Sequence, residues 1–318
     1  FKPDIVHTHA AKSGALGRLA ASNHQVPAIV HTYHGHVFHS YFNSFSTKFF
    51  VKTERFLGRK THAIIAISEA QKKELAYEFR IAPPHKFRVI PLGFNLDKFQ
   101  TDQEIKRKQF RTEFNIAEDE IIIGIIGRLV PVKNHILFIK ALAHVLQNTK
   151  KKVKAFIVGG GETRPSLEEA ASQAGIPFST EKDISFFTPL VFTSWRSDID
   201  VINAGLDIVA LTSFNEGTPV SLIEAQAANK PIVSTRVGGI SDIVHENETA
   251  LLADVNDQAL FSDHLLRLVQ DDDLRYQLGK NSSKYVMERF SYQRLVTDTA
   301  ALYNELLSET TTAHAVLR

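Results

Sequence analysis

Short apolar runs recur along the chain, and each leads into a loop that contains glycine. Residues 121–126 read Ile-Ile-Ile-Gly-Ile-Ile and continue into Gly127-Arg128, and residues 153–158 end at Gly159-Gly160-Gly161. Residues 231–235 run on to Val237-Gly238-Gly239. Uninterrupted apolar runs are typical of parallel strands buried on both faces. Because a helix-like segment follows each loop, the pattern predicts an α/β fold whose loops meet at the carboxyl edge of a parallel sheet.

The same pattern predicts two domains and a returning helix. We expect a first domain over residues 1–99, a second over 100–290, and a helical segment over 291–318. Ser68 should cap a helix that runs through Phe79, with Gln71 completing a capping box. Other expected helices are 14–21, 45–58 and 291–307. The expected strands are 5–6, 28–32, 63–67, 87–90, 121–126, 153–158, 184–187, 206–211, 231–235 and 250–252.

The segment Glu216-Gly-Thr-Pro-Val-Ser-Leu-Ile-Glu224 carries the most chemical information. Thr218 has the side chain of an N-cap, and Pro219 suits the first position of a helix because it lacks an N–H. The helix N-terminus would offer free N–H groups to a phosphate. With Glu216 before the helix and Glu224 inside it, the ligand expected is part phosphate and part polyol. The alternative is an exposed helix with two solvated acids.

Arg128 and Lys133 would bring positive charge to the same edge, where glycines let the backbone approach a phosphate. The alternative is a pair of surface cations on a loop. The triple glycine at 159–161 departs from the dinucleotide pattern G-x-G-x-x-G, because Arg164 stands at the third glycine position. The prediction of an anion site depends on the convergence of these loops.

Composition narrows the possible partners. The chain has 318 residues, enough for two domains, with 43% hydrophobic and 23% charged residues, as in ordinary globular proteins. Its net charge of +2 does not indicate a nucleic-acid binder with a basic face. The same small positive charge is compatible with weak attraction to an anionic membrane. There are no cysteines, which excludes disulfides and thiolate sites. No run of about 18 apolar residues occurs in the sequence.

With these motifs together, the whole chain resembles the GT-B glycosyltransferases of family 4. The Glu216…Glu224 pair matches the family's E-x7-E pattern, and further matches lie at Gly127-Arg128, Lys133-Asn134, the two other glycine loops and residues 91–99. The stretches 30–36 and 211–219 resemble a bacterial subgroup that builds surface polysaccharides.

This resemblance implies two Rossmann-like domains facing each other across a cleft, and an enzyme that transfers a hexose with retention. It implies a UDP-sugar donor, a glycan or lipid-linked acceptor, and no metal or other cofactor. Arg128 and Lys133 match the cations on the departing diphosphate, Glu224 the acid on the ribose, and Glu216 the acid facing the donor sugar. The donor-binding residues implied are Gly127, Gly160, Gly217, Thr218, Val220 and Glu224.

Seven of the fourteen histidines fall within the first 39 residues. His34 follows an expected strand and matches the family histidine near donor sugar and acceptor, so we expect it to take part in transfer. His36 is a weaker candidate, and His7 and His9 either line the cleft or are structural. A metal site is not expected, because no clear carboxylate spacing completes one.

A complete family member has a strand, a glycine-rich loop, a helix and further strands before the strand at Ile5. We therefore expect an incomplete first domain, through a shortened sequence, proteolysis or a companion chain that supplies the missing part. An oligomer and peripheral membrane association are the other partners considered. The expected location is the cytoplasm, with the inner face of the membrane as the alternative. Competing functions are a nucleotide-sugar 2-epimerase and a non-catalytic nucleotide-sugar-binding module.

Overall fold

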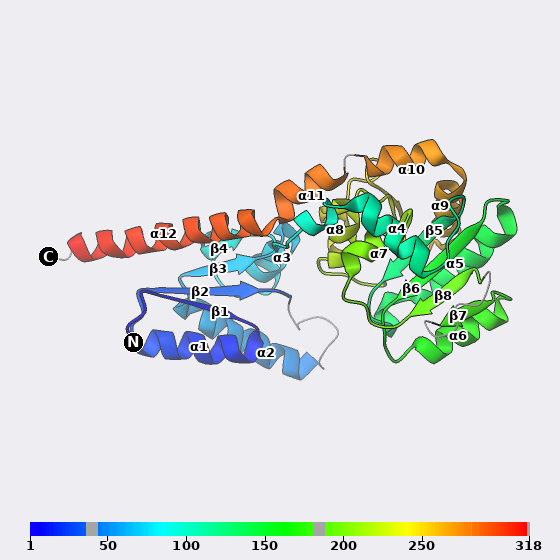
Figure 1. The fold of residues 1–318 in the computed structure, drawn as a ribbon. Coiled ribbons are helices and arrows are strands. Elements are labelled where there is room, and N and C mark those ends of the chain that lie inside the picture. Colours follow the sequence, from blue (N-terminus) through cyan, green and yellow to red (C-terminus); the bar gives the residue numbers. More distant parts are fainter. Residues whose placement is uncertain (36–43, 181–187, 281, 317–318) are drawn as a thin grey trace. The chain divides into compact units, whose positions relative to one another are not determined.

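A computed structural model describes residues 1–35, 44–180, 188–280 and 282–316 (Figure 1). The chain forms two compact units, which we call the first unit (Phe1–Phe94 with Arg289–Arg318) and the second unit (Asn95–Glu288). These units divide at residues 94/95 and 288/289, whereas the boundaries expected from sequence were 99/100 and 290/291. Residues 184–187, where we expected a strand, lie outside the described residues.

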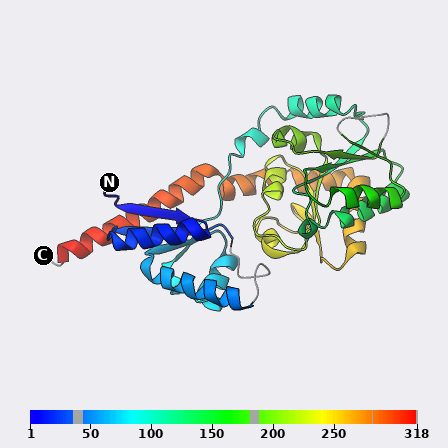
Figure 2. The ribbon, with the colours of Figure 1, turned by 90° about the horizontal axis from the view of Figure 1, so that it is seen from below.

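The first unit is a four-stranded parallel sheet in the order β1-β2-β3-β4. Helix α12 packs on one face through Leu302 and Leu306, and the other face carries Tyr33, Ile64 and the helical segments around them (Figures 1 and 2). Its elements are β1 (Ile5–His9), α1 (Ala11–Asn23), β2 (Ala28–Tyr33), α2 (Ser44–Lys60), β3 (Ala63–Ala66), α3 (Glu69–Lys73), the π-helical turn η1 (Glu74–Glu78), the 3-10 turn η2 (Pro84–Lys86), β4 (Phe87–Val89) and α12 (Tyr292–Val316).

The second unit is a seven-stranded parallel sheet in the order β11-β10-β9-β5-β6-β8-β7. Its elements are η3 (Asp97–Phe99), α4 (Gln103–Glu113), β5 (Ile121–Ile126), η4 (Pro131–Lys133), α5 (His135–Asn148), β6 (Val153–Val158), α6 (Arg164–Gln173), β7 (Phe178–Thr180), β8 (Leu190–Thr193), α7 (Ile199–Gly205), β9 (Ile208–Leu211), α8 (Val220–Ala227), β10 (Ile232–Thr235), η5 (Gly238–Asp242), β11 (Ala250–Ala253), α9 (Gln258–Gln270), α10 (Asp272–Gly279) and α11 (Ser282–Phe290), whose end belongs to the first unit.

The apolar runs form central strands because helices cover both faces of this sheet. Ile123 and Ile125 of β5 pack with α5 and α9 in the main core. On the opposite face, Phe110 and Phe114 of α4 pack against Phe156 of β6, with ring centroids 5.0 and 4.9 Å away. Strand β5 lies between β9 and β6, so the loops after these three strands emerge side by side at the carboxyl edge.

Two local expectations need correction. Ser68 accepts the Gln71 N–H at 3.1 Å, but the Gln71 side chain accepts from the Ile67 N–H and not from that of Ser68. The helix after it is α-helical only to Lys73 and continues as a π-helical turn to Glu78. The second correction concerns α8, which begins at Val220 with Pro219 as its N-cap. Thr218 is not the cap, because Pro219 keeps an extended ψ of 105° and delays the helix by one residue.

Candidate functional site

A pocket of about 480 Å³ opens at the carboxyl edge of the second unit's sheet. The loops after β5, β6, β8 and β9 line it together with the beginning of α8. Of the ten residues proposed from sequence, it brings together seven: Gly127, Arg128, Lys133, Glu216, Thr218, Val220 and Glu224. Gly160 and Gly217 lie in these loops but do not line the pocket, and His34 belongs to the first unit.

Glu216 is held by two short contacts. The Lys133 ammonium lies 2.5 Å from Glu216 Oε1, and the Ser213 hydroxyl donates to the same oxygen at 2.5 Å. The Glu216 side chain is 9% exposed and that of Lys133 21% exposed, so the ion pair is largely shielded from water. Thr212 Oγ1 also donates to the Lys133 carbonyl at 2.9 Å. The cation and the acid that sequence assigned to separate roles are therefore in direct contact.

Glycines hold the Glu216 turn in place by close packing. A Cβ at Gly238 would lie 1.8 Å from the Glu216 carbonyl oxygen, and one at Gly239 would lie 2.0 Å from that of Gly217. Gly238 also has a φ of +50°, and the Gly239 N–H donates to the Glu216 carbonyl at 3.1 Å. These glycines therefore allow the two loops to pack closely. The sequence had suggested that they allow a phosphate to approach the backbone.

The loop after β6 repeats this arrangement. A Cβ at Gly159 would lie 2.0 Å from the Gly127 carbonyl oxygen, and its φ of +142° also favours glycine. By contrast, a Cβ at Gly160 or Gly217 would meet nothing within 4 Å. Gly159 thus fixes the Arg128 loop, whereas a side chain at Gly160 or Gly217 would enter open space.

Glu224 lines the pocket from the second turn of α8 and is half-buried. Burial raises its pKa to about 7, Lys98 opposes this shift, and Asp200 adds to it. Near neutral pH the side chain is therefore divided between carboxyl and carboxylate. It can accept hydrogen bonds from the hydroxyl groups of a ligand, and it repels an incoming dianion less than a fully ionised acid would.

Sequence reasoning missed the residues that follow β8. The Trp195 side chain lines the pocket and is 74% exposed. Arg196 beside it is fixed by Asp198, at 2.9 and 2.6 Å, and by Glu113, at 2.5 and 3.0 Å. The signal was the apolar run Leu190-Val-Phe-Thr193 before Trp195. It resembles the other strand–loop transitions and would have placed this loop at the same edge.

Three histidines of the first unit, His7, His9 and His34, form their own cluster. His34 Nε2 lies 2.9 Å from His9 Nδ1, and His7 is hydrogen-bonded to Tyr303 at 2.6 Å and to Thr32 at 2.7 Å. Burial and the neighbouring His9 lower the pKa of His34 and lower that of His7 to about 4. These side chains border a largely apolar pocket of about 400 Å³ along α12. His36 lies outside the described residues.

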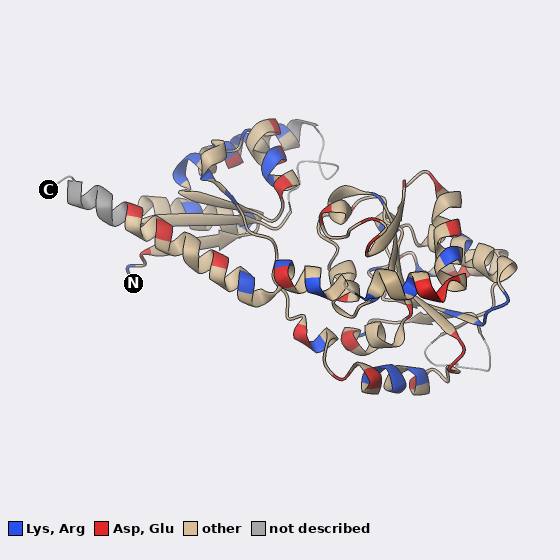
Figure 3. Cartoon of the chain, turned by 90° about the horizontal axis from the view of Figure 1, so that it is seen from above, with Lys and Arg blue, Asp and Glu red and all other residues tan. Residues whose placement is uncertain are grey.

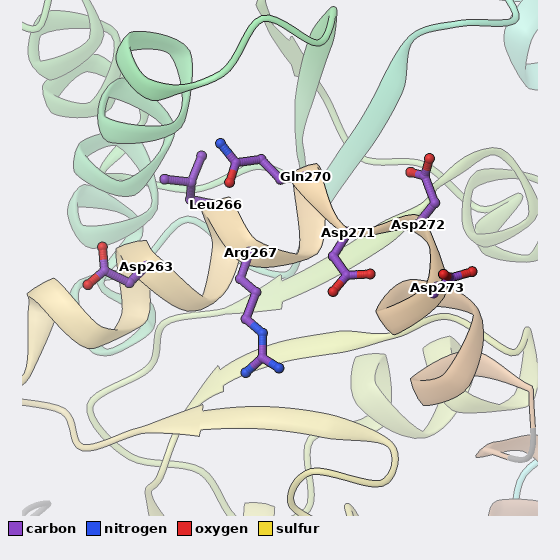
Figure 4. A pocket seen from close by; sticks show the side chains of 7 residues that line it. All are labelled: Asp263, Leu266, Arg267, Gln270, Asp271, Asp272 and Asp273. Atoms are coloured by element: carbon purple, nitrogen blue, oxygen red, sulfur yellow. The ribbon is translucent and has the colours of Figure 1, made fainter.

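A third hollow, beside α9 and α10, has a different character (Figure 4). Two of its acids, Asp271 and Asp272, have structural partners. Asp271 accepts the Leu274 N–H at 2.8 Å, and Asp272 pairs with Lys151 at 2.6 Å and with Arg275. Among the described residues, no group of three or more His, Asp or Glu is arranged to hold a metal ion. The pocket beside Glu216 brings together seven of the ten residues that the sequence motifs singled out.

Two parallel α/β units, with an acid–cation pocket at the sheet edge of the second, define a GT-B glycosyltransferase. The family described as "Glycosyl transferases group 1" matches residues 106–285, and "Glycosyltransferase Family 4" matches residues 1–98. The chain belongs to the group 1 glycosyl transferases, and it is a glycosyltransferase. The expected family and fold class are confirmed.

Relatives and solved structures agree with this assignment. The chain is 29% identical over 310 residues to the Escherichia coli UDP-Gal:alpha-D-GlcNAc-diphosphoundecaprenol alpha-1,3-galactosyltransferase, covering 96% of this chain and 76% of that protein. It is 27% identical to the Staphylococcus aureus capsular polysaccharide biosynthesis glycosyltransferase CapM, covering 97% and 78%. Anabaena HepE, solved in complex with UDP, shares the fold with a TM-score of 0.76 at 21% identity, covering 98% and 79%.

Proposed function

We propose that this chain transfers a hexose from a UDP-sugar to a glycan or lipid-linked acceptor in bacterial polysaccharide synthesis, with retention of the anomeric configuration. The observation that carries the proposal is the pocket that joins Arg128, Lys133, Glu216, Glu224 and the start of α8. The named activities of the E. coli and S. aureus relatives and the UDP bound to HepE support it.

The order of the strands suggests how a nucleotide sugar would lie. Glu216 follows β9 and Trp195 follows β8, with β5 and β6 between them. At a strand spacing of about 4.8 Å, these loops stand roughly 14 Å apart. Arg128, after β5, lies between the two ends. We therefore place the donor sugar beside Glu216, the diphosphate near Arg128 and the start of α8, the ribose at Glu224, and the base beside Trp195.

Bond cleavage explains the charges. The bond between the sugar C1 and the phosphate oxygen breaks with its electrons on the oxygen. A hydroxyl oxygen of the acceptor forms the new bond to C1, and its proton passes to the departing phosphate oxygen. Arg128, Lys133 and the positive end of α8 stabilise the departing diphosphate. Lys133 would do so while paired to Glu216. The positive charge of Lys133 would then lie near the leaving group, and the negative charge of Glu216 near the sugar ring, which becomes electron-poor. This chain's residues thus supply charge stabilisation without a metal ion.

The direct test is calorimetric titration with UDP. Arg128→Ala and Glu224→Ala should each weaken binding sharply, and Arg128→Ala should lower the transfer rate by about 10²–10³. Arg267→Ala, which removes an exposed arginine outside this pocket, is the matched control. Unchanged UDP affinity in both pocket variants would refute the site.

Further assays test the finer claims. Product configuration read by NMR tests retention, and full activity after chelator treatment tests independence from metal.

The role of His34 in transfer remains a prediction. His34→Ala should lower the rate of transfer while the second unit binds UDP with unchanged affinity. Incubating UDP-GlcNAc without acceptor tests the epimerase alternative, for which an epimerised product is required.

A further inference from the structure

Ser213, just after β9, is a fully buried residue held on two sides. Its hydroxyl donates to Glu216 Oε1 at 2.5 Å, three residues further along the chain. Its carbonyl accepts from the hydroxyl of Thr235 at 2.7 Å. Thr235 is also fully buried and is the last residue of β10, the strand that pairs with β9. The side chain of Glu216 is therefore connected through Ser213 to the central sheet.

The two carboxylate oxygens of Glu216 have different surroundings. Oε1 accepts from Ser213 and also from the Lys133 ammonium, at 2.5 Å each. A carboxylate oxygen has about two lone-pair sites, so these two donors occupy Oε1. Among the residues that the structure describes, none donates to Oε2. Because Glu216 lines the pocket, Oε2 is the oxygen that a ligand can use.

The turn at Glu216 does not need the serine hydroxyl to keep its path. Its main chain is already held by the Gly239 N–H, which donates to the Glu216 carbonyl at 3.1 Å. Buried hydroxyl groups usually donate to main-chain carbonyls. The fully buried Ser282 follows this rule and donates to two such carbonyls, at 3.1 and 2.8 Å. Ser213 donates instead to the acid that lines the pocket, which points to a role in ligand binding.

Shielding from water gives this contact its effect. Acids and cations occur on many elements of the second unit (Figure 3). Some of its ion pairs are open to solvent, such as Lys151–Asp272, whose acid is 70% exposed. The Glu216 side chain is only 9% exposed. Hydrogen bonds to an ionised group are stronger in such a site than in water, so a shift of the Glu216 carboxylate should change ligand affinity measurably.

We propose that Ser213 is a positioning residue for the donor sugar. It holds Oε1 of Glu216, so that Oε2 accepts a hydrogen bond from a hydroxyl group of the sugar. This inference rests on the proposed function and deepens it. A glutamate side chain loses rotamer freedom when it is ordered. Because Ser213 and Lys133 order the carboxylate before the ligand arrives, the sugar does not have to do so, and it binds more tightly.

Calorimetric titration separates this role from support of the fold. UDP-glucose, UDP-galactose and UDP-GlcNAc are titrated into the full chain, and the one that binds most tightly is compared with UDP. Ser213→Ala should weaken binding of this UDP-sugar roughly tenfold and leave the affinity for UDP, which has no hexose, unchanged. Thr235→Val should have the same effect to a smaller extent. Ser282→Ala removes an equally buried hydroxyl outside the pocket and should change neither affinity.

A double-mutant cycle tests whether Ser213 acts through Glu216. In a Glu216→Ala background, Ser213→Ala should cause no further loss of UDP-sugar affinity, because the carboxylate that it holds is gone. An equal loss in both backgrounds overturns the inference, as does an unchanged UDP-sugar affinity in Ser213→Ala alone. A parallel loss of UDP affinity also overturns it, since the effect would then not concern the sugar. If the parent does not bind UDP, the proposed function itself fails, and this inference fails with it.

Discussion

The two units have the same parallel βα architecture but distribute their charges differently. In the second unit, cations and acids converge on loops at the sheet edge, where Lys133 and Glu216 lie 2.5 Å apart. In the first unit, the pair Arg18–Glu54 is buried, and the exposed face of α2 carries cations without an acid among them. A whole-chain charge of +2 conceals both arrangements. Partners are therefore better inferred from each unit separately.

The largest effect should come from breaking the first unit's buried pair. Glu54→Ala leaves the fully buried Arg18 without its carboxylate and should destabilise the first unit by about 3–5 kcal/mol. Denaturant unfolding should show an earlier transition, while the second unit still binds UDP. Glu78→Ala, at an exposed acid of the same unit, should change stability by about 0.5 kcal/mol or less. If Glu54→Ala and Glu78→Ala unfold at the same denaturant concentration, the Arg18–Glu54 pair does not stabilise the first unit.

A smaller effect, dependent on pH, is expected at Glu224 in the second unit. Its pKa of about 7 exceeds the usual 4.5, so the folded state binds a proton more tightly than the unfolded state does. Between these two values the stability of the parent should fall as pH rises, by at most about 3 kcal/mol in total. Residue 224 does not titrate in Glu224→Gln. The free energy of unfolding of this variant, relative to that of the parent, should therefore increase across this window and stay constant at higher pH.

Urea unfolding at a series of pH values measures this difference. Glu248→Gln, at an exposed acid, is the control and should run parallel to the parent. The same Glu224→Gln variant should bind UDP more weakly, because the carboxylate that accepts from the ribose is gone. If the free energy of unfolding of Glu224→Gln differs from that of the parent by the same amount at every pH, burial does not raise the pKa of Glu224.

The smallest of these effects concerns the edge of the pocket in the second unit. Trp195 is the only tryptophan of the chain, so its fluorescence reports on one site. UDP should quench this emission if the base stacks on the ring, and Trp195→Ala should weaken UDP binding roughly tenfold. Trp195→Phe should keep most of the affinity. Pyrophosphate, which lacks a base, should bind the parent and Trp195→Ala equally. An unchanged UDP affinity in Trp195→Ala would exclude stacking.

The bounds of the strands were predicted most accurately where the apolar runs were unbroken. The runs at 121–126 and 153–158 match β5 and β6 to the residue, because unbroken apolar segments ending at glycine loops leave little choice of register. Strands β7 and β8 were not anticipated, since they are short and stand on either side of the segment where a strand was expected. With β8 misplaced, Trp195 and Arg196 could not be assigned to the pocket.

Site residues were predictable as a set but not in their contacts. Seven of the ten line one pocket because their loops all follow parallel strands. The Lys133–Glu216 contact joins residues 83 positions apart and follows from the pairing of β5 with β9, which sequence alone does not reveal. The raised pKa of Glu224 depends on burial by neighbouring elements, which a single motif does not specify.

The glycines at 238 and 239 impose a restriction on how this enzyme can diversify. Their backbone touches the carbonyls of Glu216 and Gly217 with no space for even a methyl group. Any inherited substitution there would have to be matched by a new path for the neighbouring turn. Changes in sugar preference should therefore accumulate in surrounding side chains, while these two crossing segments are inherited together.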